Sequence, residues 1–419
     1  MKKRIIIKNG KIFDGIRAEV IENQIIEIRE DLISYVGSEK LEESESEVID
    51  AKGKLIMPGI IDCHVHIGGI LGAGTIDRIL EPNMQQAMVA VGQAKETVAH
   101  GITTVCDVSM AGPYLKKLIN KGKLVGPRIL PCGQGFAMGG GGPYVDPCGI
   151  FDTKYLRENH PWGYPCDGAD NLRHGVRMRL REGCEAIKVW TTGGGLQKRR
   201  NDTDRIYTDE ELQALCNEAK MAGVPVLSHC ESIEGTKAAL RNGIKCILHG
   251  VELDDECIDI FLNKEAWLMP TFKINLDWVE YYTDEELSRR TYIKNIDGET
   301  MQEKEYNRIL LNFEKAYKKG VKIALASDTY CSAKTPYGKY TLDEIRTFVN
   351  SANVGVFETL FAATRYAAEA LNISNTVGTI EKGKIADMVI FKKDITKDIN
   401  FLKKENIEMV IKAGEVLNL

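Results

Sequence analysis

Between residues 55 and 370, short runs of apolar and often β-branched residues alternate with longer segments in which apolar residues recur at helical spacing. This alternation is typical of βαβ units that build a parallel sheet. Amphipathic helices are predicted over 85–101, 209–223 and 314–320. The apolar runs cover residues 55–66, 102–108, 128–133, 186–192, 224–230, 244–250, 266–272 and 321–328. Eight strands within about 270 residues predict an α/β fold of the (β/α)8 TIM-barrel type, which needs about 250 residues.

The two ends of the chain follow a different pattern. Residues 1–54 and 377–419 consist of short apolar runs separated by turns that contain Gly and Asn. Short strands need partners to bury one face, and neither end offers enough of them alone. We therefore predict a small β-sandwich built from both chain termini, beside a metal-dependent barrel domain of residues 55–376. A doubly wound open sheet is the alternative, but no G-x-G-x-x-G follows the first strand.

Composition narrows the classes of function. The 419 residues include 55 Lys and Arg against 60 Asp and Glu, for a formal net charge of −5, so a nucleic-acid binder is not expected. The longest stretch without a charged residue, 129–145, is rich in Gly and shorter than the roughly 20 residues of a membrane span. The 11 cysteines contain no C-x-x-C pair, and the apolar run near the N-terminus is too short for a signal peptide. These features predict a cytoplasmic protein without a membrane partner.

Histidines gather where predicted strands end. Four of the seven, His64, His66, His229 and His249, lie in the last residues of such runs. Residues i and i+2 of a strand project from the same face, so His64 and His66 can bind one metal ion together. An isolated H-x-H pair would be weak support, because core and surface histidines are frequent. The other two histidines at equivalent positions strengthen the prediction.

Two further residues allow more than one interpretation. Asp328 ends the last apolar run, where it could complete a metal shell, accept a proton from bound water, or simply cap the next helix. Lys188 lies inside an apolar run, and a buried lysine needs a partner or a neutral form. It could form a core ion pair or extend its amine to solvent. As an ammonium it could not bind a cation, whereas as a carbamate it could.

Taken together, the motifs resemble the amidohydrolase superfamily. The resemblance extends over essentially the whole chain and is greatest to the branch of imidazolonepropionase-like proteins and Xaa-Pro or Xaa-Arg dipeptidases. The motifs that carry it are DCHVH (62–66), IKVWTTGG (187–194), LSHC (227–230), ILHG (247–250) and ASD (326–328).

The resemblance implies a binuclear metal-dependent hydrolase of amide or peptide C–N bonds, acting on dipeptides or N-acyl amino acids. It implies a hydroxide shared by two divalent ions, with zinc favoured by the all-N/O ligands, and Asp328 as acid and base. Cyclic-amide opening or deamination of a heterocycle is the alternative. Relatives often assemble, so a homo-oligomer is expected. The implied ligands, with Lys188 as a bridging CO2-derived carbamate, are His64, His66, Lys188, His229, His249 and Asp328.

The predicted substrate loops depart from the family pattern. The segment 136–147 lacks the histidine of the T-G-G-H-G motif, so either Tyr144 replaces it or the glycines only allow a close backbone approach. Arg200 could bind a substrate carboxylate or belong to a solvated loop. Glu231 could pair with a cationic substrate or cap the helix that begins near Ile233. The segment 277–295 is either a lid or a surface helix.

Overall fold

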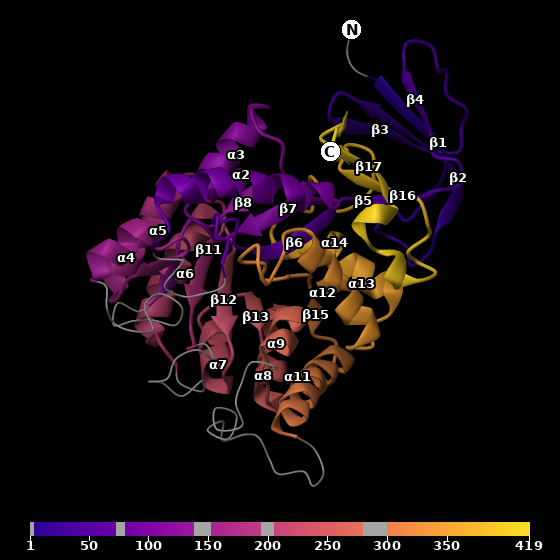
Figure 1. Ribbon diagram of the computed structural model, residues 1–419. Helices are drawn as coiled ribbons and strands as arrows, with labels where there is room; N and C mark the ends of the chain where they lie inside the picture. Colours follow the sequence, from indigo (N-terminus) through magenta and orange to yellow (C-terminus); the bar gives the residue numbers. More distant parts are fainter. Residues whose placement is uncertain (1–3, 73–79, 138–151, 194–204, 280–299) are drawn as a thin grey trace.

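The computed structural model describes residues 4–72, 80–137, 152–193, 205–279 and 300–419. It is an α/β structure in which parallel strands are flanked by helices, and a separate sheet lies to one side (Figure 1). The first and last strands of the chain, β1 and β18, belong to that separate sheet. Within the described ranges no helix is long and apolar enough to cross a membrane.

The separate sheet contains strands from both ends of the chain. Its strand order is β18-β17-β16-β5-β1-β2-β3, and β4 pairs with β1. An isoleucine-rich cluster, with Ile5, Ile26, Ile390 and Ile411 among its members, forms its core. The strands are β1 (Arg4–Ile12), β2 (Ile21–Arg29), β3 (Leu32–Gly37), β4 (Glu47–Asp50), β5 (Leu55–Pro58), β16 (Met388–Phe391), β17 (Ile407–Lys412) and β18 (Glu415–Val416).

The remaining strands are parallel and form two sheets, with orders β6-β7-β8 and β10-β9-β11-β12-β13-β14-β15. Backbone hydrogen bonds connect their edges: Glu185 donates to Pro131 at 2.8 Å, and Cys63 donates to Leu325 at 2.9 Å. The strands are β6 (Ile60–Val65), β7 (Ile102–Asp107), β8 (Arg128–Pro131), β9 (Gly135–Ala137), β10 (Gly163–Pro165), β11 (Ile187–Trp190), β12 (Val226–Cys230), β13 (Cys246–His249), β14 (Trp267–Met269) and β15 (Lys322–Ile323).

Two predicted strands need correction. The run 55–66 is not one strand: β5 pairs with β1 and β16 in the terminal sheet, whereas β6 pairs with β7. The chain changes sheets at Gly59, where a Cβ atom would overlap the side chain of Thr103. The run 321–328 is regular only in β15, and its end is held instead by a hydrogen bond from the Asp328 N–H to the carbonyl of His64 at 2.9 Å.

Helices follow most of the parallel strands, and local sequence explains where they begin and end. Helix α6 starts with a capping box between Thr208 and Glu211, and it stops at Gly223, whose φ of 71° suits glycine. The helices are α2 (Asn83–Ala99), α3 (Gly112–Asn120), α4 (Thr153–Asn159), α5 (Ala169–Arg181), α6 (Asp209–Ala222), α7 (Ile233–Arg241), α8 (Asp255–Lys264), α9 (Phe272–Val279), α11 (Met301–Lys318), α12 (Lys339–Asn350), α13 (Val356–Ala362), α14 (Arg365–Ala370) and the 3-10 turns η1 (Ile399–Phe401) and η2 (Lys404–Asn406).

Candidate metal centre

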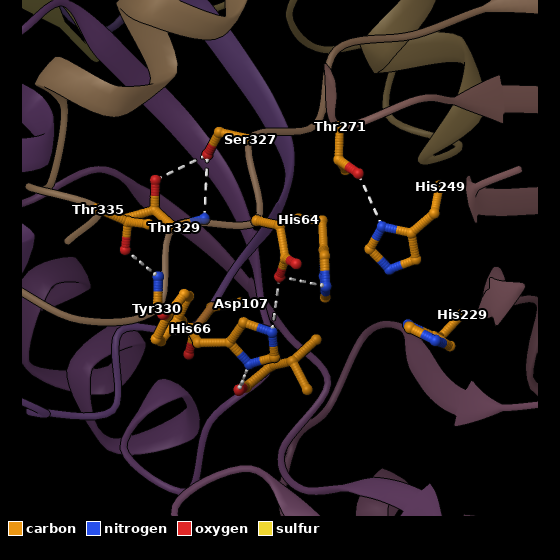
Figure 2. Close-up of polar contacts among 12 residues, drawn as sticks. His64, His66, Asp107, His229, His249, Thr271, Ser327, Thr329, Tyr330 and Thr335 are labelled. Carbon is orange, nitrogen blue, oxygen red and sulfur yellow. Dashed lines mark hydrogen bonds and ion pairs between the residues drawn. The ribbon is translucent and has the colours of Figure 1, made fainter. Parts of the chain in front are cut away.

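The six residues predicted as ligands line one pocket at the C-terminal ends of the parallel strands. Histidines come from β6, β12 and β13, the lysine from β11, and the aspartate follows β15. In Figure 2 the rings of His64 and His66 lie on one side of the site, and those of His229 and His249 lie on the other. The fold thus brings together side chains that are up to 264 positions apart, from 64 to 328.

The first group consists of His64, His66 and Asp328. Oδ1 of Asp328 lies 3.2 Å from Nε2 of His64 and 3.1 Å from Nε2 of His66. Nδ1 of His66 lies 2.9 Å from the Val108 carbonyl oxygen, which can only accept, so this nitrogen carries the hydrogen. In the neutral ring, Nε2 is then a lone-pair acceptor that faces a carboxylate oxygen. A cation between the three groups would remove this conflict, and their ligand atoms lie within 4.8 Å of one another.

Burial sets the charge state of this group. It lowers the pKa of the His64 imidazole well below its usual value, so this ring stays neutral and able to bind a metal. Burial acts to raise the pKa of Asp328, but the close polar contacts with the His64 and His66 rings outweigh it and hold the pKa well below its usual range. The aspartate is therefore ionised at neutral pH.

The second pair of histidines lies across the pocket. The ring centroids of His229 and His249 are 4.4 Å apart, and those of His64 and His249 are 6.5 Å apart. Burial lowers the pKa of His249 to about 3 and that of His229 well below its usual value, so both rings are neutral. Nδ1 of His249 lies 2.7 Å from the Thr271 hydroxyl, which fixes the ring and leaves its other nitrogen toward the pocket.

Lys188 lines the same pocket and is almost completely buried, with 1% of its surface exposed. Its Nζ has no hydrogen-bond partner among the described residues and lies 4.9 Å from the centre of the Trp190 ring. Burial lowers its pKa to about 8. The sequence allowed a core ion pair or an amine that extends to solvent. Among the described residues Lys188 forms no ion pair, and its amine is buried.

Two buried aspartates support the site, and the sequence analysis missed both. Asp62 accepts hydrogen bonds from the N–H groups of His64 (3.1 Å) and Ser327 (3.0 Å), so it ties β6 to the segment that carries Asp328. Asp107, at the end of β7, accepts one from the N–H of Ile67 at 2.6 Å. The signal was present, because a charged residue inside an apolar strand run needs a buried partner.

The predicted substrate residues have mixed outcomes. Tyr144 and Arg200, with the loop 136–147 beyond Ala137 and most of the possible lid at 277–295, lie outside the described residues. Glu231 does not cap the next helix, because Ser232 does so by accepting from the N–H of Gly235. Instead, Oε1 of Glu231 lies 3.4 Å from Nε2 of His229.

We compared the sequence and the structure of this chain with those of known proteins. A model of the Amidohydrolase family matches residues 55–417. Ochratoxinase of Aspergillus niger is 26% identical over 441 aligned positions, which cover 99% of this chain and 86% of that protein. Imidazolonepropionase of Rhizobium rhizogenes is 25% identical, with 91% and 90% covered. A solved Xaa-Pro dipeptidase with methionine bound in its active site superposes with a TM-score of 0.82 at 29% identity, covering 99% of this chain and 100% of that one.

An α/β fold with buried histidines and an ionised aspartate around one pocket is typical of a metal-dependent hydrolase. The chain belongs to the Amidohydrolase family. Together with the enzymes it resembles, this makes it a hydrolase of C–N bonds, and the resemblance drawn from the motifs is confirmed.

Proposed function

We propose that the pocket holds two divalent metal ions, most readily zinc. The first would be held by His64, His66 and Asp328, whose ligand atoms lie within 4.8 Å of one another. The second would be held by His229 and His249. Lys188, carboxylated by CO2, would bridge the two; its buried amine, without a partner among the described residues, supports this role. The donor set of imidazole and carboxylate groups suits zinc, manganese, cobalt or iron.

Two ions bound there would supply an activated water and polarise the carbonyl of the scissile amide. The contribution of the chain itself is proton transfer and orientation. Asp328 is ionised, so its carboxylate can accept the proton that the attacking water loses and deliver it to the leaving amine. Thr271 keeps His249 in one orientation, and Asp62 keeps the backbone of His64 in place.

We propose dipeptides or N-acyl amino acids as the substrate class, because the chain resembles a Xaa-Pro dipeptidase and an ochratoxinase over nearly its whole length. The second candidate is hydrolysis of a cyclic amide or deamination of a heterocycle, which the likeness to imidazolonepropionase favours.

We further infer that β6–β8 and β11–β15 close into a (β/α)8 barrel, because hydrogen bonds link Glu185 to Pro131 and Cys63 to Leu325 across the two sheet edges. The barrel would occupy about residues 55–376. Residues 1–54 and 377–419 would form a β-sandwich, since Ile33 donates a backbone hydrogen bond to Lys384 and so links the outer strand β3 to the segment before β16. The ten described cysteines are all unpaired thiols, which supports a cytoplasmic protein, and we expect a homo-oligomer.

Metal analysis and a substrate panel test this proposal together. The zinc-reconstituted protein, prepared with bicarbonate, should contain two ions per chain and hydrolyse dipeptides or N-acyl amino acids. The variant Asp328→Asn should lose about 10²- to 10⁴-fold in kcat. One ion per chain in active protein would refute the binuclear site. Turnover confined to cyclic amides or heterocycles would favour the second candidate.

A further inference from the structure

Among the described residues, the wall of the candidate metal pocket beyond the predicted ligands is mostly aromatic and apolar. Of the ten described residues that line it, the four beyond the ligands are Trp162, Trp190, Ile274 and Tyr330. None of these four carries a charge at neutral pH. Glu231, which the sequence suggested for a cationic substrate, is not among them and lies against His229 instead.

Trp162 lies directly beside the predicted first metal. Its ring centroid is 5.0 Å from that of His66 and 6.3 Å from that of Tyr330, with the latter pair edge to face. Only 3% of its surface is exposed. A substrate positioned with its carbonyl at His66 would therefore place its neighbouring group against the Trp162 indole.

The segment that carries Trp162 is held rigidly. Nδ1 of His160 accepts hydrogen bonds from the N–H groups of Trp162 (3.3 Å) and Gly163 (2.8 Å). The Trp162 carbonyl accepts from the N–H of Gly135 at 2.7 Å, which ties the segment to β9. The buried side-chain amide of Gln134 also donates a hydrogen bond to the carbonyl of His160 at 2.9 Å. The indole is thus fixed before any substrate arrives, which reduces the entropy lost on binding.

We propose that Trp162, together with Ile274 and Tyr330, selects substrates with an apolar and preferably aromatic group next to the scissile amide. The inference rests on the proposed function and specifies its substrate class. Apolar groups gain from leaving water in such a pocket, and aromatic groups gain further from edge-to-face contacts with indole and phenol rings. A charged side chain packed against Trp162, Ile274 and Tyr330 would lose its hydration, and none of these three side chains offers it a group of opposite charge.

The test is kcat/KM on matched substrates that differ only in side chain: N-acetyl-phenylalanine, -leucine, -alanine, -aspartate and -lysine. The zinc-loaded wild type should prefer phenylalanine over alanine by at least about tenfold, and it should use the two charged substrates least. Trp162→Ala should lower kcat/KM about 10- to 100-fold for phenylalanine and much less for alanine. Trp162→Phe should restore most of the preference.

Trp267→Phe is the matched control, because Trp267 stands at the start of β14 beside Tyr366 and does not line the pocket. It should leave the order of preference unchanged. Equal loss on every substrate in Trp162→Ala, or efficient use of N-acetyl-lysine by the wild type, would overturn the apolar subsite while leaving the amide-hydrolase proposal standing. No turnover of any N-acyl amino acid by protein with both metals bound would overturn both.

Discussion

Glu344 is a buried carboxyl group that should make the protein less stable as the pH rises. It lies on α12 with 0% of its surface exposed and accepts hydrogen bonds from the N–H groups of Phe272 (2.7 Å) and Lys273 (2.6 Å), at the start of α9. Burial raises its pKa from 4.5 to about 8 in spite of these two bonds. Between these values the folded protein holds a proton that the unfolded chain has released.

The sign and size of the effect follow from this difference in bound protons. Because the folded state binds more protons in this window, stability is highest at low pH and is lost as the pH rises toward about 8. Each pH unit in the window costs about 1.4 kcal/mol, so the loss from Glu344 between pH 5 and pH 8 is about 4 kcal/mol. Glutamine has nearly the same shape and does not titrate. Its single oxygen can accept only one of the two backbone hydrogen bonds, because Phe272 donates to Oε1 and Lys273 to Oε2 of Glu344, but this loss does not depend on pH.

We therefore expect the stability of Glu344→Gln, relative to wild type, to improve by about 4 kcal/mol between pH 5 and pH 8. The assay is urea unfolding of the metal-free proteins at several pH values, so that metal binding does not contribute. Glu210→Gln, at an exposed position of α6, controls for the removal of one acidic group. An infrared band of a protonated carboxyl group, present near pH 7 and missing in Glu344→Gln, gives an independent readout. Parallel pH curves for wild type and Glu344→Gln would refute the raised pKa.

Two further predictions concern the metal centre. Lys188→Met should stabilise the metal-free protein by about 1 to 3 kcal/mol in thermal unfolding, because it removes a buried amine without a described partner. The same variant should lose bound metal and activity. Two bound ions and full activity in Lys188→Met would exclude the bridging carbamate. Thr271→Val should weaken binding of the second metal about 10- to 100-fold in a chelator competition, because Nδ1 of His249 loses its partner. Thr271→Ser should bind nearly as wild type does, and equal affinity in Thr271→Val would show that the hydroxyl does not orient His249.

Much of the fold, and the gathering of the six predicted ligands around one pocket, could be predicted from the sequence, because both depend on local pattern and on one topological rule. Apolar runs bounded by turns predict strands, and capping residues such as Thr208 predict where helices start. The C-terminal ends of parallel strands converge, so histidines at the ends of three runs lie near one another in space.

The sequence failed where tertiary contacts override local pattern. No local sequence pattern shows where the chain changes sheets within 55–66. Glycine is needed at position 59 because the side chain of Thr103, 44 positions away in the sequence, lies where a Cβ atom would be. Both Glu231 and Ser232 can cap a helix, and only the structure shows that Ser232 does so while Glu231 lies against His229. Trp162 falls in a stretch without regular period. Its position depends on a hydrogen bond that its N–H donates to His160 and on one that its carbonyl accepts from Gly135, and no local pattern predicts either bond.

The site also contains backbone strain that the sequence conceals. His249, Thr271 and Asp328 have φ angles of 69°, 47° and 55°, in the left-handed region that side chains disfavour, and the β-branched Thr271 is the most unusual of the three. Such residues cost about 1 to 3 kcal/mol each and persist only where the surroundings fix them. Here the fixing contacts are visible: Asp328 donates to the carbonyl of His64, and Glu344 holds the two N–H groups that follow Thr271. All three strained residues lie where a parallel strand gives way to a turn, and their side chains are a predicted ligand of each metal and the group that orients one of them. Glycine would relieve the strain at any of these positions but would remove the side chain on which the chemistry depends, so the strain is best understood as a requirement of the metal centre.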